Sequence, residues 1–224
     1  MLDDFLISDC ACMRIGKPGH IKKDKDKMGS EHKLWNALSE KVSQIRGGRS
    51  MELFEVMQQR HSIRAYTGEV ISEEAMEMIL RAGLLSPSGR AVRPWELIVV
   101  REREMLQHMA KCRIAGAQML EKADAAIVVI GDETKTDVWI EDCSIVVSNM
   151  HLAAESLGIG SCWIQGRLRE AKPGLSTEDY LRECLRFPEQ YRLEAILSLG
   201  VPARHPKPTD IAGLHTEKIH FGTF

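Results

Sequence analysis

The sequence predicts an α+β fold, in which helices wrap a central antiparallel or mixed sheet, in a domain that spans residues 51–224. Three observations lead to this fold class. Helical and strand-like patterns alternate along the chain after residue 51, and no internal repeat is present. One long segment, residues 137–157, is apolar on more than one face, as is typical of a helix buried on most sides. The chain has 224 residues, which is enough for one well-buried domain and short for two.

The first elements follow from apolar spacing and capping residues. Residues 52–60 carry apolar side chains at helical spacing, and a second helix is expected from Ser72, a good N-cap, to about Leu85. Residues 95–100 are a strand candidate, and a helix is expected near residues 102–120. The apolar run 125–130, followed by glycine, favours a buried strand.

The second half of the chain continues this alternation. The long helix over residues 137–157 is expected to end at the glycines of residues 158–160, since glycine readily takes the left-handed conformation after a helix. A short strand over 161–165, a helix over 177–185 and a core strand over 192–201 complete the domain. The outer face of the long helix packs either against a second subunit or inside a monomer, and the pattern alone fits both.

Residues 1–50 are set apart as an N-terminal extension, partly disordered or vector-derived. Residues 22–27 are a run of mixed charges that is not expected to pack, and residues 31–46 are expected to form an amphipathic helix. Two glycines then interrupt any helix, and Met51 begins a new pattern.

Composition excludes several classes of function. The net charge of −2 gives no broad attraction to nucleic acid or to an anionic membrane, and no apolar run approaches the length of a membrane span. The six cysteines lack CxxC spacing, and the two C-terminal histidines are five residues apart in an expected tail, so no metal site is predicted. No secretory signal is recognised at the N-terminus, so a cytoplasmic location is expected.

The sequence RHSIR at residues 60–64 offers two arginines and a hydroxyl within five positions. Such a group suits a phosphate monoester, because guanidinium groups bind phosphate oxygens in pairs. A charged helix terminus explains the same residues equally well.

Two further segments can approach a ligand. The sequence SPSGRAVRPW at residues 86–95 forces an irregular loop between a helix and a strand, although plain connections share this character. The sequence GIGSCWIQG at residues 158–166 ends a helix instead of opening one and lacks a third glycine, so it is no dinucleotide fingerprint. No local motif for a catalytic residue is present.

Taken together, these segments resemble the flavin-dependent nitroreductase family in order and spacing, from about Met51 to Phe224. Residues 60–64 resemble the family's phosphate-binding R-x-S-x-R, and residues 86–95 its A-P-S-x-x-N-x-Q-P-W loop. Residues 142–165 resemble its central dimer helix and G-L-G-x-x-W turn. The sequence LGVPA at 199–203 resembles its late G-Y-P-A, and residues 219–221 its terminal V-H-Y.

The resemblance implies an FMN-dependent oxidoreductase that uses NADH or NADPH and works as an intimate homodimer, with exchanged terminal arms such as residues 215–224. It implies no dedicated catalytic side chain, because donor and acceptor both stack on one open flavin face. The residues implied to bind the cofactor are Arg60, His61, Ser62, Arg64, Pro87, Ser88, Gly89, Arg93, Gln165, Gly166 and Lys207. Of these, residues 60–64 would hold the FMN phosphate and ribityl chain, residues 87–89 would approach the isoalloxazine partly from the partner subunit, and residues 165–166 would lie near flavin N5.

The sequence departs from the family at two places. Ala91 and Arg93 stand where the family usually has Asn and Gln. The family's late phosphate-binding Arg is absent from residues 208–218, and Lys207, just before this segment, is the candidate to replace it. The implied reaction passes hydride from NAD(P)H through flavin N5 to an electron-poor small molecule such as a nitroaromatic or quinone. Alternatives are another reaction of the family, such as reductive dehalogenation or oxygen-dependent flavin chemistry, a flavin-binding or regulatory module with little turnover, and a purely structural α+β protein.

Overall fold

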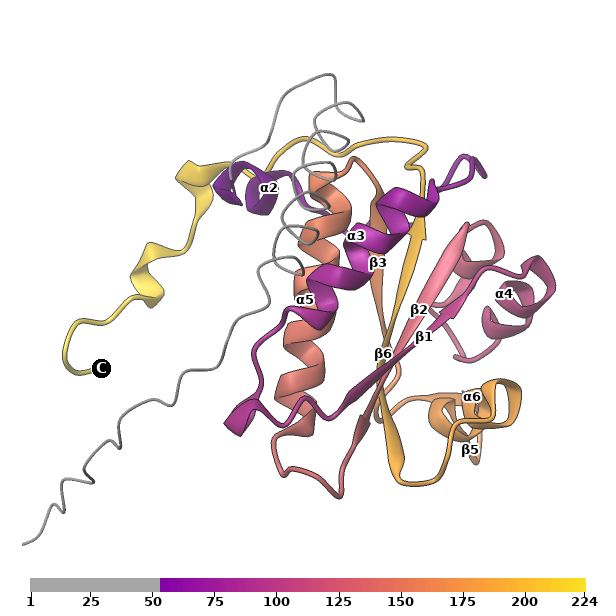
Figure 1. Ribbon diagram of the computed structural model, residues 1–224. Helices are drawn as coiled ribbons and strands as arrows, with labels where there is room; N and C mark the ends of the chain where they lie inside the picture. Colours follow the sequence, from indigo (N-terminus) through magenta and orange to yellow (C-terminus); the bar gives the residue numbers. More distant parts are fainter. Residues whose placement is uncertain (1–52) are drawn as a thin grey trace, which may run out of the picture. The chain divides into compact units, whose positions relative to one another are not determined.

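The structure, a computed structural model, describes residues 53–224 (Figure 1). The predicted helix over residues 31–46 and the charged run at 22–27 lie outside the described residues. Four strands form one antiparallel sheet in the order β1-β2-β6-β3. They are β1 (Trp95–Val100), β2 (Ala125–Asp132), β6 (Tyr191–Gly200) and β3 (Gly160–Gln165). The predicted strands are therefore confirmed, with β2 two residues longer than expected.

The core lies on both faces of this sheet. All eight residues of β2 are buried, because helices cover the strand on both sides. Ile127 and Val129 belong to one apolar cluster, and Val128 and Ile130 belong to the other. This division follows from the two-residue side-chain period of a strand. The sheet is thus the middle of three layers, as the α+β prediction requires.

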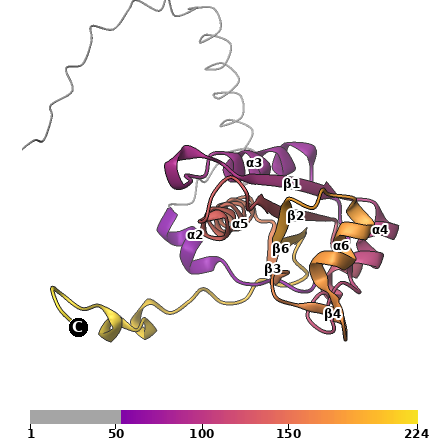
Figure 2. The same cartoon turned by 90° about the horizontal axis from the view of Figure 1, so that it is seen from below.

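The helices divide between the two faces of the sheet. α5 (Trp139–Ser156) packs on one face with α3 (Glu73–Leu84) against it, while α4 (Arg103–Met109) and α6 (Thr177–Leu185) cover the other face (Figures 1 and 2). α3 approaches α5 closely at Gly83, where an added Cβ would come within 2.9 Å of the Met150 side chain. The N-cap of α3 is Ser72, as predicted, and its hydroxyl accepts the Ala75 N–H at 3.2 Å.

The helix predicted near residues 102–120 is wrong in length. α4 ends at Met109, and only a short 3₁₀ turn, η2 (Gln118–Glu121), follows it. The intervening backbone leaves the helical path because Gly116 has a φ of +91° and the Ile114 N–H donates to Glu170 O at 2.9 Å. That bond ties the segment to a small hairpin, β4 (Glu170–Lys172) and β5 (Leu175–Ser176), which the sequence did not predict.

The C-terminal segment crosses the end of the sheet and returns to the first described helix, α2 (Leu53–Gln59) (Figure 1). Beyond this contact it contains two 3₁₀ turns, η3 (Ile211–Gly213) and η4 (Thr216–Lys218), and every side chain from residue 203 onward is exposed. Within residues 53–224, no helix combines the length and apolar character that a membrane crossing requires.

Candidate functional site

The predicted phosphate segment, residues 60–64, leaves the end of α2 and runs along β3. The Ile63 N–H donates to Ser161 O at 2.9 Å, which fixes the segment against the first half of that strand. Ile63 is buried, whereas Ser62 and Arg64 on either side of it are exposed. This alternation is that of an extended chain, so the hydroxyl and the guanidinium of the motif face outward together.

The first arginine of the motif, Arg60, is hydrogen-bonded to a buried histidine, His151. Arg60 Nη1 lies 3.0 Å from Nε2 of His151 on α5, and His151 Nδ1 contacts Ser161 Oγ. Burial, with the positive Arg60 alongside, lowers the pKa of His151 to about 4. His61, in contrast, turns its ring back to α2, where Nδ1 donates to Gln59 O at 2.7 Å.

The C-terminal segment borders the same motif. Three backbone hydrogen bonds pin residues 201–209 antiparallel to residues 58–67: Thr67 N–H to Val201 O at 2.9 Å, Ala203 N–H to Ala65 O at 3.0 Å and Thr209 N–H to Gln58 O at 2.9 Å. The Gln58 amide also donates to Thr209 O at 3.0 Å. Arg204 and Lys207 lie between these pinned points. The segment therefore carries two more cations past the motif.

No carboxylate among the described residues forms an ion pair with these cations, which are Arg60, Arg64, Arg204 and Lys207. Like charges gathered without a counter-charge repel one another, and a bound anion relieves that repulsion. Arginine in particular matches the oxygens of a phosphate group. The donor set therefore fits the terminal phosphate of a ligand such as FMN.

The loop at residues 86–94 is the second predicted region, and its backbone is strained. Arg90, Ala91 and Arg93 have φ values of +53°, +56° and +50°, a conformation unfavourable for residues other than glycine. The Gly89 N–H donates to Asp142 Oδ1 at 2.8 Å, and an added Cβ at Gly89 would come within 2.7 Å of the Val138 side chain.

Two side-chain contacts complete the restraint on this loop. The Arg93 N–H donates to Ser88 Oγ at 2.9 Å, and Arg90 binds Asp137 Oδ1 at 2.7 Å. Several contacts near the beginning of α5 therefore hold the loop backbone in its strained conformation. Pro87 and Arg93 remain exposed on its surface.

The structure does not bring this loop next to the phosphate segment of the same chain. The loop is anchored at Asp142 and the segment at His151, nine residues further along α5. At 1.5 Å per residue, the two anchors are about 14 Å apart along the helix axis.

Gln165 and Gly166 close the far end of β3. Ser161 borders the phosphate segment, and Gln165 follows four residues later, about 13 Å along the strand at the usual rise. The Gly166 N–H donates to Glu194 O at 3.2 Å, as does the Arg167 N–H at 3.0 Å. The Gly166 amide therefore forms a hydrogen bond within the chain, at the turn that follows β3.

Glu194 is a buried acid beside this turn. Its Oε1 accepts from Ser144 Oγ at 3.2 Å, whereas Oε2 is buried without a hydrogen-bond partner among the described residues. Burial raises the pKa of Glu194, and the Ser144 hydrogen bond opposes this rise. The buried second oxygen favours a protonated carboxyl here.

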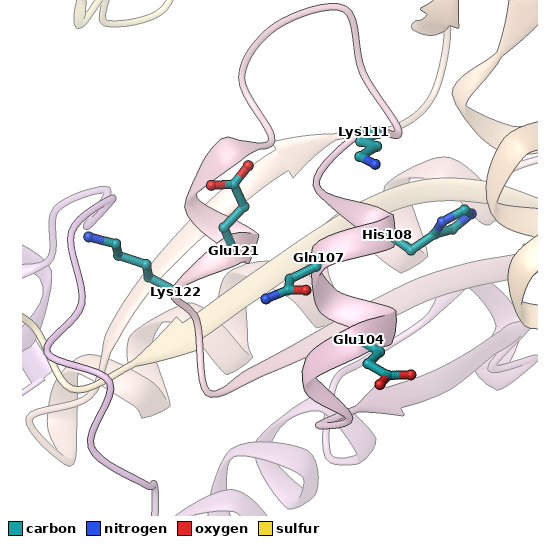
Figure 3. A pocket seen from close by; sticks show the side chains of 6 residues that line it. All are labelled: Glu104, Gln107, His108, Lys111, Glu121 and Lys122. Carbon is teal, nitrogen blue, oxygen red and sulfur yellow. The ribbon is translucent and has the colours of Figure 1, made fainter.

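A hollow of about 490 Å³ lies elsewhere, between α4 and η2 (Figure 3). Its lining is polar and mixes acids and bases with one amide; the residues are Glu104, Gln107, His108, Lys111, Glu121 and Lys122. None of the predicted site residues contributes to it. In a single chain, the candidate site is an open surface built on α2, β3 and the C-terminal segment.

Sequence reasoning missed three residues that matter to this site. His151 and Glu194 look like isolated polar residues within apolar patterns, and only the packed structure shows what they contact. Arg204 was detectable, because it stands three positions before Lys207 in the same segment.

Comparison with known proteins agrees with this architecture. The family model described as the Nitroreductase family matches residues 57–118 and 107–201. A protein of Archaeoglobus fulgidus with the provisional name NADH dehydrogenase/NAD(P)H nitroreductase is 42% identical over 155 residues, which are 67% of this chain and 86% of that protein. A protein of Methanothermobacter thermautotrophicus with the same provisional name is 34% identical over 192 residues, 84% of this chain and 96% of that one.

A solved structure provides the matching fold. The FMN-dependent nitroreductase of Clostridium difficile R20291 superimposes with a TM-score of 0.75 at 40% sequence identity, over 76% of this chain and 99% of that chain. The family model, the identities and the shared fold lead to one conclusion: this chain belongs to the nitroreductase family.

Proposed function

We propose that this protein is an FMN-dependent oxidoreductase that passes hydride from NADH or NADPH to an electron-poor small molecule such as a nitroaromatic or quinone. The observation that carries the proposal is the cations on the paired segments 60–64 and 204–207, none of which forms an ion pair with a described carboxylate, in a chain of the nitroreductase family. Names of relatives agree with it, since they include an FMN-dependent nitroreductase and NAD(P)H nitroreductases.

The residues of the chain supply binding and orientation. Arg60, Ser62 and Arg64 hold the phosphate end, with Lys207 beside them in the place of the family's late arginine. β3 leads from this end toward Gln165, so an extended ligand lies along the strand with its ring at the far end. When bound, FMN supplies the redox chemistry, because its N5 accepts a hydride and returns it to a second molecule.

Arg93 sets the charge at the ring end. Its backbone is held by Ser88 and its side chain is exposed, so the loop presents a fixed positive charge at its surface. Such a charge favours an anionic reduced cofactor or an acidic acceptor. Ala91 presents only a methyl group, and so it supplies no polar contact in place of the family's Asn.

The functional unit in this proposal is a homodimer. The loop at residues 87–89 is about 14 Å from the phosphate segment of its own chain along α5, so it does not border the phosphate. The resemblance to the family implies that the partner's loop approaches the ring. Apolar side chains that a lone subunit leaves exposed support this assembly. They lie on α2, α5 and the C-terminal tail and are Leu53, Phe54, Met57, Ile145, Ile211, Leu214, Ile219, Phe221 and Phe224.

Spectroscopy tests the proposal directly. Apo-protein titrated with FMN should quench flavin fluorescence, and sedimentation should give a dimer. Anaerobic addition of NADH or NADPH should bleach the flavin absorbance, and a panel of nitroaromatic, quinone and halogenated acceptors should restore it at different rates. Failure to bind FMN would refute the proposal, and binding without bleaching would identify an inert flavin carrier.

A further inference from the structure

His151 connects the phosphate segment to the interior of the domain. The Arg60 guanidinium can only donate hydrogen bonds, so His151 Nε2, 3.0 Å from Nη1, is the acceptor. The ring proton is then on Nδ1, which donates to Ser161 Oγ. Because the side chain is 6% exposed and lies beside a positive charge, the ring is neutral at physiological pH and keeps its lone pair for Arg60.

Ser161 fixes this arrangement relative to the rest of the motif. Its carbonyl accepts the Ile63 N–H at 2.9 Å, and it pairs with Ser62 as an isolated parallel bridge. One residue of β3 therefore holds both the backbone of the phosphate segment and the ring that holds Arg60. The guanidinium is thereby oriented with respect to the Ser62 hydroxyl before any ligand arrives.

We propose that His151 is a positioning residue of the phosphate site, which restrains one guanidinium nitrogen of Arg60 and so presents the remaining N–H donors to the phosphate of the ligand. The proposal rests on the assignment of residues 60–64 to phosphate capture. Preorganised donors bind more tightly because fewer side-chain conformations are lost on binding. The consequence is selective: His151 strengthens binding of the phosphate group and leaves binding of the flavin ring unchanged.

The experiment compares FMN with riboflavin, which lacks the phosphate, in fluorescence titrations of full-length apo-protein. His151→Asn keeps a short amide that can donate to Ser161 but cannot reach Arg60. His151→Gln extends a carbonyl oxygen to the place of Nε2. We expect H151N to weaken FMN binding about tenfold, the effect of one misdirected charge-assisted hydrogen bond, with riboflavin within about twofold. H151Q should restore most of the FMN affinity.

A double-mutant cycle with Arg60→Ala completes the design. If His151 acts through Arg60, H151N has no further effect on FMN affinity in the R60A background. Equal losses of FMN and riboflavin in H151N, or no loss of either, would overturn the proposal. Should H151N fail to fold, as thermal melting would show, the comparison of Ser161→Ala with wild type decides the question, because S161A removes the acceptor that holds the ring.

Wild-type protein provides the separate test of the underlying function. If it binds FMN no more tightly than riboflavin, phosphate capture by residues 60–64 is itself wrong. If it prefers FMN and the His151 variants keep that preference, only the positioning role is wrong.

Discussion

Replacing Asp142 by Ala should release the strained loop at residues 86–94. The Asp142 carboxylate is 3% exposed and accepts the Gly89 N–H at 2.8 Å. A hydrogen bond to a charged group contributes about 1.5–3 kcal/mol, and its removal leaves the Gly89 amide without that acceptor. The loop also stores roughly 1–2 kcal/mol at each of three left-handed residues, and this strain opposes the folded loop once the anchor is lost.

The expected loss is about 2 kcal/mol of unfolding free energy, because Asp142 Oδ2 is buried without a hydrogen-bond partner among the described residues and its removal offsets part of the cost. Asp142→Asn keeps the acceptor oxygen and should lose less. Urea denaturation measures both values, and tryptic cleavage at the Arg90–Ala91 bond, followed by mass spectrometry, reports the loop itself. D142A should be cut faster at this bond than wild type.

Glu141→Ala is the matched control. It removes an exposed acid from the neighbouring position of α5 and should change stability by less than about 0.5 kcal/mol. The reasoning is refuted if D142A is as stable as E141A and is cleaved at Arg90 no faster than wild type. In that case the loop holds its conformation without Asp142.

Three further predictions concern stability. The folded pKa of His151, about 4, is below its unfolded value, so its neutral form contributes stability above pH 6.5 that is lost as the pH falls toward 4. Across that pH range, urea titrations should show that wild type loses roughly 3 kcal/mol more unfolding free energy than H151Q. The pKa of Glu194 is raised, so stability is lost as the pH rises above its ordinary value of 4.5; above that pH, Glu194→Gln should gain stability relative to wild type, and identical denaturation profiles for the two would contradict this. Gly160→Ala would place a Cβ 2.9 Å from the Ile63 side chain and should cost about 1–3 kcal/mol in urea denaturation, whereas an unchanged midpoint would mean that the segment yields without cost.

Local signals in the sequence were sufficient for most of the fold. The N-cap at Ser72 and the helix over residues 177–185 were predicted correctly, because capping and apolar spacing act within a few residues. The helix expected near 102–120 was wrong, since a backbone hydrogen bond from Ile114 to distant Glu170 decides the path there. Pairings over such separations leave no periodic trace in the sequence.

The same distinction applies to the site. The motif at residues 60–64 is contiguous, so its arginines and hydroxyl were found directly, and the structure places Ser62 and Arg64 on one exposed face. The partner of Arg60 is 91 residues away in the chain, and nothing in the pattern of α5 distinguishes His151 from a histidine with a purely packing role. Only the packed fold shows that the two meet. The cofactor-binding roles of the predicted residues, from Arg60 to Lys207, stay predictions until the titrations are made.

The pairing of the C-terminal segment with residues 58–67 also bears on how this protein is made. Gln58 and Thr209 are 151 residues apart in sequence, yet they are hydrogen-bonded to each other at one end of the cationic site. During synthesis, Arg60 and Arg64 are made early, and nearly the entire domain must be synthesised before Arg204 and Lys207 can pack beside them. Contacts of such long range form late, because the entropy of closing the intervening chain must be overcome first. Capture of a phosphate-bearing cofactor is therefore expected to be one of the last events in the maturation of each newly made chain.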